Sequence, residues 1–190
     1  MTKRLFASAV VLAFAFASTG LPAKEVDKPS KRELKRQAID QVAVDTMTRL
    51  FDERPKSHDL YRQCYGYAVF DNLKISLGIT GGGGVGVAVI RGTDNKTYMK
   101  MATGGLNLGL GGQTYQVVFV FQDQRTYENF VEKGWQAEAG ANAVAGKRGA
   151  NAEASFTQGL AVFQLTSAGA MLQADISGTK YWKHKKLNRY

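Results

Sequence analysis

Hydrophobic residues alternate with glycine or polar residues through the middle of the chain, between residues 67 and 123. Val85, Val87 and Val89 are separated by Gly86 and Ala88, and the same two-residue period returns over residues 115–122. This period is typical of β-strands. Twelve of the 21 glycines lie between residues 78 and 112, and glycine within a strand marks a bulge, a bend or a close backbone approach. The pattern therefore predicts the scaffold of a curved antiparallel sheet.

A three- and four-residue spacing of apolar residues precedes this block, over residues 31–52. It predicts one amphipathic helix, which Ser30 and Glu33 begin as a capping box and Pro55 ends. The helix either covers the sheet or lies on anionic lipid. The apolar residues with this spacing are Leu34, Ala38, Ile39, Val42, Met47, Leu50 and Phe51.

The spacing of hydrophobic residues in the rest of the chain predicts shorter helices and strands. Residues 92–96 form a hairpin loop between strands 85–91 and 97–102. Further strands are expected at residues 104–114, 117–121, 135–145, 150–156, 160–166 and 170–177, with a short helix over residues 123–133 that Gly134 ends. Together these elements predict an α+β fold, in which the N-terminal amphipathic helix packs on a strongly curved, glycine-rich antiparallel sheet or a flattened barrel.

The first 23 residues have the pattern of a signal peptide. Lys3 and Arg4 precede an apolar run over residues 5–17, and Ala23 is a small residue at the expected cleavage point. We expect cleavage after Ala23 and export to the periplasm, with an uncleaved anchor as the alternative. Residues 24–30 then form a linker, and residues 31–190 form a single domain with a basic C-terminal tail.

Charge narrows the choice of partners. The formal net charge is +9, which favours nucleic acid, acidic lipid or another acidic polymer. Nucleic acid is not expected, because an exported chain rarely meets it and no recognition helix is evident. The only cysteine, Cys64, excludes an internal disulfide and is interpreted as a small buried hydrophobic residue.

Two basic clusters are the candidate anion-binding residues. One begins the predicted helix and the other occupies the tail, where Tyr181, Trp182 and Tyr190 accompany the charges. Such clusters attract anionic surfaces, although the alternatives are a solvated helix face and a frayed terminus. Their members are Lys31, Arg32, Lys35 and Arg36 in the helix, and Lys180, Lys183, Lys185, Lys186 and Arg189 in the tail.

No catalytic, cofactor or metal motif is evident. Gly81, Gly83 and Gly86 fit the spacing of a dinucleotide-binding loop, but that motif needs a helix next and the following residues are strand-like. His58 and His184 lie far apart and, with one cysteine, give no metal-ligand spacing. We expect a protein that is not an enzyme and that carries no cofactor.

The order of several segments resembles the SYLF lipid-binding domain family, which is also known from fungal actin-associated proteins. The resemblance covers approximately residues 60–180, although Asp71 stands where the family usually has proline, and Tyr98 is the aromatic residue before the middle glycine strand. The matching segments are residues 66–70, Gly78, and residues 81–86, 87–91, 104–113, 117–121 and 141–146.

The resemblance implies binding of phosphoinositides or acidic phospholipids with the help of a basic N-terminal helix, and actin association in some members. It further implies a lipid-contacting lysine, which corresponds to Lys74. Actin and inositol lipids do not suit an exported bacterial protein, so phosphatidylglycerol, cardiolipin and phosphatidic acid are the expected ligands. The alternatives are a structural or protein-interaction module of the cell envelope and a barrel that holds a lipid chain.

Overall fold

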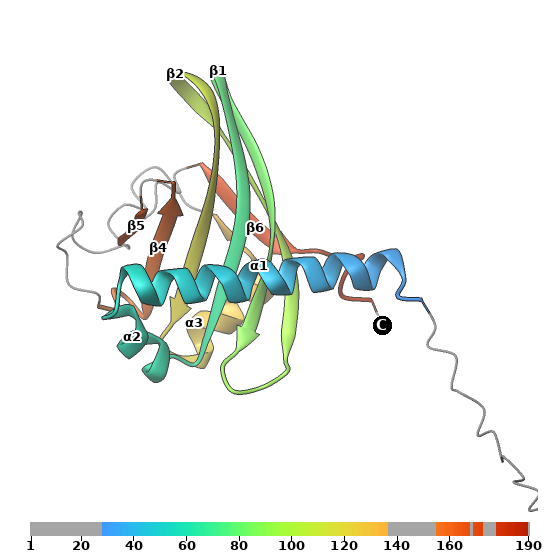
Figure 1. The fold of residues 1–190 in the computed structure, drawn as a ribbon, viewed down its shortest axis with the longest axis vertical. Helices are drawn as coiled ribbons and strands as arrows, with labels where there is room; N and C mark the ends of the chain where they lie inside the picture. Colours follow the sequence, from blue (N-terminus) through green and yellow to red (C-terminus); the bar gives the residue numbers. More distant parts are fainter. Residues whose placement is uncertain (1–27, 137–154, 168, 173–177, 190) are drawn as a thin grey trace, which may run out of the picture.

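The computed structural model describes residues 28–136, 155–167, 169–172 and 178–189. The predicted leader therefore lies outside the described residues. Helix α1 (Lys31–Glu53) crosses the front of the molecule, and the short helix α2 (Ser57–Gln63) follows it (Figure 1). The Ser30 amide donates to the Glu33 carboxylate at 2.6 Å, and the Glu33 amide donates to Ser30 Oγ at 3.2 Å. The predicted helix and its capping box are confirmed.

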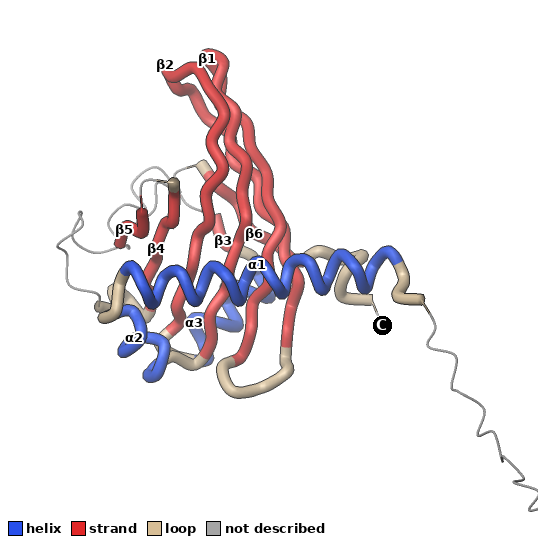
Figure 2. The backbone as a smooth tube through the Cα atoms, viewed as in Figure 1, coloured by secondary structure: helices blue, strands red, loops and turns tan. Residues whose placement is uncertain are grey.

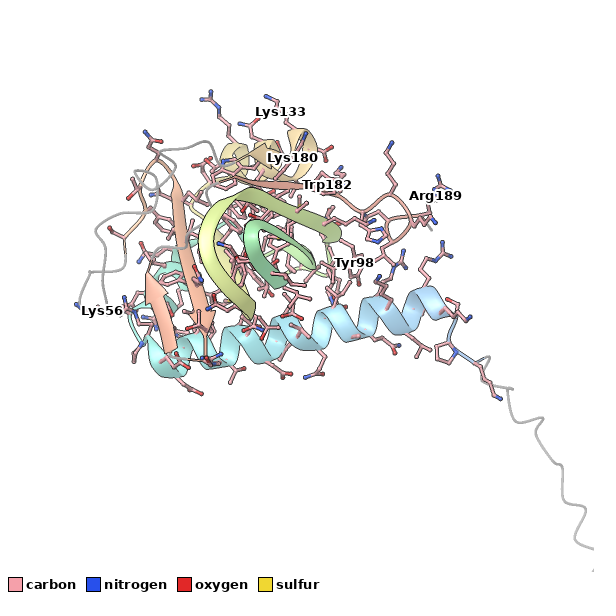
Figure 3. The ribbon with its side chains drawn as sticks, turned by 90° about the horizontal axis from the view of Figure 1, so that it is seen from above. Lys56, Tyr98, Lys133, Lys180, Trp182 and Arg189 are labelled. Atoms are coloured by element: carbon pink, nitrogen blue, oxygen red, sulfur yellow. The ribbon has the colours of Figure 1, made fainter. Side chains whose placement is uncertain are left out.

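Two very long strands form the centre of the sheet. Strand β1 (Gly66–Ile90) pairs antiparallel with β2 (Lys96–Phe121), from Gly66 opposite Phe121 to Val89 opposite Lys96. Figure 3, seen from above, shows them as two nested arcs with β2 outside β1. The predicted hairpin loop is confirmed, but the separate strands expected on either side of it are continuous, because glycine allows each strand to bend without ending.

The two halves of β1 approach each other at glycines. A Cβ on Gly82 would lie 2.5 Å from the carbonyl oxygen of Leu73, and one on Gly86 would collide with the carbonyl of Val69 and the ring of Phe70. At these positions any side chain would separate the two halves. The glycines therefore provide a close backbone approach, as the sequence pattern predicted.

Shorter elements extend the sheet on both sides of this pair. Helix α3 (Gln124–Glu128) continues as the π-helix η1 (Asn129–Lys133), so the predicted short helix is confirmed with a wider second turn. Strands β3 (Trp135–Gln136), β4 (Leu160–Thr166), β5 (Gly169–Leu172) and β6 (Thr179–Lys183) complete the described sheet. Most of the strand expected at residues 150–156 and the later parts of those at 135–145 and 170–177 lie outside the described residues.

The order of the strands is β3-β6-β2-β4-β5, with β1 pairing β2. β6 pairs with the first part of β2 and β4 with its last part. Because this order begins and ends at unpaired strands, the described sheet is open, and the flattened barrel that we considered is wrong. The α+β class and the antiparallel arrangement are confirmed.

Each face of the sheet carries its own core. Ile39, Met47 and Leu50 of α1 pack with one cluster, which includes Val69 and Phe163. The opposite face holds an aromatic cluster that joins the sheet to α3 and η1, made of residues such as Phe70, Phe119, Tyr127, Phe130 and Tyr181. Alternate residues of β1 thus pack into the cores on opposite faces of the sheet, and α1 is fixed on one of these faces.

Candidate anion-binding groove

The C-terminal tail is anchored to the start of α1. The guanidinium of Arg36 donates from Nε to the carbonyl oxygen of Leu187 at 2.8 Å, and from Nη2 to that of Arg189 at 3.0 Å. It also lies over the ring of Tyr98, 5.5 Å from its centroid. Asn188 exchanges two hydrogen bonds with the main chain of Tyr98, at 2.9 and 2.7 Å. A frayed tail is therefore wrong for residues 178–189.

This anchoring places members of the two basic clusters side by side. They line an open groove of about 740 Å³, and Figure 3 shows Arg189 near the N-terminal end of α1. None of its six basic side chains has an ion pair within the described part of the chain. The groove is lined by Lys31, Arg32 and Lys35 of α1, Lys100 of β2, and Lys186 and Arg189 of the tail, together with Ser30, His184 and Leu187.

His184 lies buried at the centre of these charges, with 6% of its surface exposed. Its Nδ1 accepts the Leu187 amide at 3.3 Å, which in the neutral ring leaves the proton on Nε2. Burial, then the positive charge of Lys100, and more weakly that of Lys35 and Lys186, lower the pKa of the imidazole. Apart from burial, these lysines create a positive potential that favours an anion in the groove and disfavours one more cation.

Five of the candidate anion-binding residues meet in this groove, namely Lys31, Arg32, Lys35, Lys186 and Arg189. Lys100 and His184 were not predicted. Lys100 sits in a strand between two methionines and His184 in a charged tail, so only the pairing of β2 with β6 shows that they are neighbours. No signal in the local sequence could have found them.

The other predicted residues lie outside the groove. Lys183 forms an ion pair with Glu132 at 2.6 Å. Lys180 is exposed beside Lys133, on the side of the sheet away from α1 (Figure 3). Lys185 is exposed and Lys74 is half-buried in β1, and neither lines the groove. Their assignment as lipid-binding residues stays a prediction.

Arg36 was predicted to attract lipid, but its bonds make it the residue that holds the tail in place. We expect Arg36→Ala to lower the free energy of unfolding by about 2 kcal/mol, because hydrogen bonds from a charged group are lost and the partly buried carbonyl of Leu187 loses its donor. Arg32→Ala, an exposed neighbour on the same helix, should change it by less than about 0.5 kcal/mol. Urea unfolding measures both variants, and equal losses would contradict the assigned role of Arg36.

The single cysteine, Cys64, does not line the groove. Cys64 is buried, and burial raises the pKa of its thiol to about 11. Its interpretation as a buried hydrophobic residue is confirmed. Within the described ranges, no cluster of histidine, cysteine and acidic residues could hold a metal ion, and none of the described helices is both long and apolar enough to cross a membrane.

Comparison with known proteins finds a family that matches the second half of the chain. Residues 102–190 match the model of the family described as Ysc84, Las17-binding protein actin regulator. The chain is also 42% identical over 163 residues to beta cell expansion factor A of Aeromonas veronii. That alignment covers 86% of this chain and 62% of the relative, so the chain spans less than two thirds of that protein. Residues 102–190 thus match the Ysc84, or SYLF, family, in agreement with the resemblance to that family found in the sequence.

Proposed function

We propose that the protein is an exported, peripheral membrane protein that binds the head groups of acidic phospholipids in the basic groove. The observation that carries this proposal is the convergence of six basic side chains from α1, β2 and the tail on one open surface. Five of them come from two clusters that are more than 150 residues apart in the sequence. A solvated helix face does not require basic residues from separate elements to converge, whereas recognition of an anion does require it.

The energetics of the groove suit reversible adsorption. A basic residue close to an anionic membrane surface contributes about 1 kcal/mol, so six could supply several kcal/mol before the loss of mobility is subtracted. Because the side chains are exposed to solvent, this attraction is screened as salt is added. The groove therefore predicts binding that depends on both lipid charge and ionic strength.

The family supports the class of ligand. The Ysc84 family is lipid-binding and actin-associated, and we extend the lipid-binding property to this chain. The predicted signal peptide supports export, for which phosphatidylglycerol, cardiolipin and phosphatidic acid are the available anionic lipids and actin is an improbable partner. Catalysis is not part of the proposal, since the described residues that line the groove include no carboxylate and its one serine, Ser30, caps α1.

Vesicle flotation tests the proposal. Purified protein is floated with phosphatidylcholine vesicles that contain or lack phosphatidylglycerol, from about 0.1 M to about 1 M NaCl, a range over which the Debye length falls from about 10 Å to about 3 Å. We expect recovery with the anionic vesicles at low salt and much weaker recovery with neutral ones. Equal recovery with both vesicles, or none with either, would favour a structural or protein-interaction module of the envelope.

A further inference from the structure

One stretch of β1 has its apolar and polar residues on the opposite sides from those of a water-soluble strand. Leu73 and Ile75 are each 47% exposed, whereas Asn72 and Ser76, which alternate with them, are only 2% and 9% exposed. A soluble sheet buries the apolar residues and exposes the polar ones. Apolar residues outside and polar residues inside are the pattern of strands that face lipid.

This stretch lies where the paired strands β1 and β2 extend beyond the rest of the fold, at the end away from their connecting loop (Figures 1 and 2). By alternation Leu73 and Ile75 share the face of Val69, which packs in the core beneath α1. The helix does not extend over them. Their partners on β2 are Thr114 and Gly112, and a Cβ built on Gly112 would meet no atom within 4 Å. The apolar strip therefore has no cover from the strand beside it.

The same stretch also lies next to the basic groove. Asn72 is buried, and its Oδ1 has no hydrogen-bond partner. It lines a hollow of about 410 Å³ with Leu73, and that hollow shares Lys35, Lys100 and His184 with the basic groove. The exposed apolar strip and the cationic groove are thus parts of one continuous surface.

We propose that the projecting part of the hairpin inserts Leu73 and Ile75 among lipid acyl chains while the basic groove holds the head groups. The inference rests on the proposed function and adds to it a second, apolar point of contact. A membrane matches this surface better than a folded partner does, because cations beside exposed aliphatic residues complement head groups beside acyl chains.

The backbone limits how deep this insertion goes. Within the described sheet β1 pairs with β2 on one side only, so about half of its main-chain groups have no strand partner. The outer edge of β2 pairs with β6 only up to Thr103 and with β4 only from Gln116, so the described sheet gives the edge between them no strand partner. Unpaired main-chain groups are costly in hydrocarbon, and the contact is therefore shallow, at the level of the interface.

An environment-sensitive fluorophore on Ile75→Cys reports insertion directly. The native Cys64 is buried and its thiol pKa is raised to about 11, so maleimide NBD labels the new cysteine selectively. With phosphatidylglycerol vesicles we expect a blue shift and a several-fold rise in emission that nitroxide-labelled acyl chains quench. The same label on Lys133→Cys, on the other side of the sheet (Figure 3), should not respond.

A second measurement separates this inference from adsorption in the groove. We expect the double variant Leu73→Gln, Ile75→Gln to float normally at low salt. At high salt, where apolar contacts dominate, its partition coefficient should be about ten- to thirty-fold lower than that of the wild-type protein. The control exchange Leu73→Ile, Ile75→Leu preserves the apolar character and should leave the partition coefficient at high salt unchanged.

If the protein floats but the label on Ile75→Cys emits as it does in water, the inserted strip is wrong, whereas binding of head groups in the groove still stands. Concentration-dependent self-association without lipid, lost in the Gln variant, would instead assign the strip to a second copy of the chain. Absence of flotation would overturn both proposals.

Discussion

Replacing Gly86 with alanine is expected to lower the free energy of unfolding by about 2–3 kcal/mol, at the upper end of the range for overpacked sites. The new methyl group would collide with the carbonyl of Val69 and the ring of Phe70. Neither can move aside, since one is backbone in the opposite half of β1 and the other is fully buried in the aromatic core. Urea unfolding followed by circular dichroism measures the loss.

Two other glycines of the same sheet provide the matched control. A Cβ on Gly81 or Gly105 would meet no atom within 4 Å, and neither has a positive φ. Alanine there should leave stability unchanged or raise it by about 0.5 kcal/mol, because it restricts the unfolded chain. Comparable losses of stability at all three positions would show that glycine serves strand bending in general. The role assigned to the close contact between the halves of β1 would then be wrong.

The sequence predicted the elements of this fold better than their extent. The alternation of Val85, Val87 and Val89 identified a strand, and the capping box of Ser30 located the start of α1 correctly. The glycines were interpreted as signs of close backbone approach, but the local sequence does not identify the backbone segment that each glycine contacts. Gly86 faces Val69 only because β1 folds back on itself, and that partner is set by long-range pairing.

Reversing three charges in the groove is expected to weaken binding to phosphatidylglycerol vesicles more than about 100-fold. In Lys31→Glu, Arg32→Glu, Lys35→Glu, three attractions of about 1 kcal/mol each are lost and repulsions replace them. Arg36 is left in place, because it holds the tail that carries Lys186. Titration of vesicles against a fixed protein concentration gives the partition coefficient.

This variant should fold as well as the wild-type protein. Positions 31 and 32 are the first two residues of α1, where glutamate interacts favourably with the helix dipole by about 0.3–1 kcal/mol. We therefore expect an unchanged or higher melting temperature. A clearly lower one would mean that these lysines and arginine support the fold, and the loss of binding could not then be assigned to the groove.

The candidate site was only partly accessible from the sequence. Charge density identified both basic clusters, and Lys31, Arg32, Lys35 and Lys186 do share one groove. The sequence could not show that Arg36 would be used to bind main-chain carbonyls, or that Glu132 would neutralise Lys183. Those outcomes depend on how the tail docks against α1 and on where η1 meets β6.

The most direct test of the account compares two variants of equal charge on the same vesicles. The groove variant Lys31→Glu, Arg32→Glu, Lys35→Glu and the control Arg125→Glu, Lys133→Glu, Lys180→Glu both lower the formal charge from +9 to +3. The control residues are exposed and line no part of the groove. If the groove binds the head groups, the control should keep most of its partition coefficient while the groove variant loses at least about 100-fold. Equal losses in the two variants would mean that net charge alone drives adsorption, and the groove would have no special role.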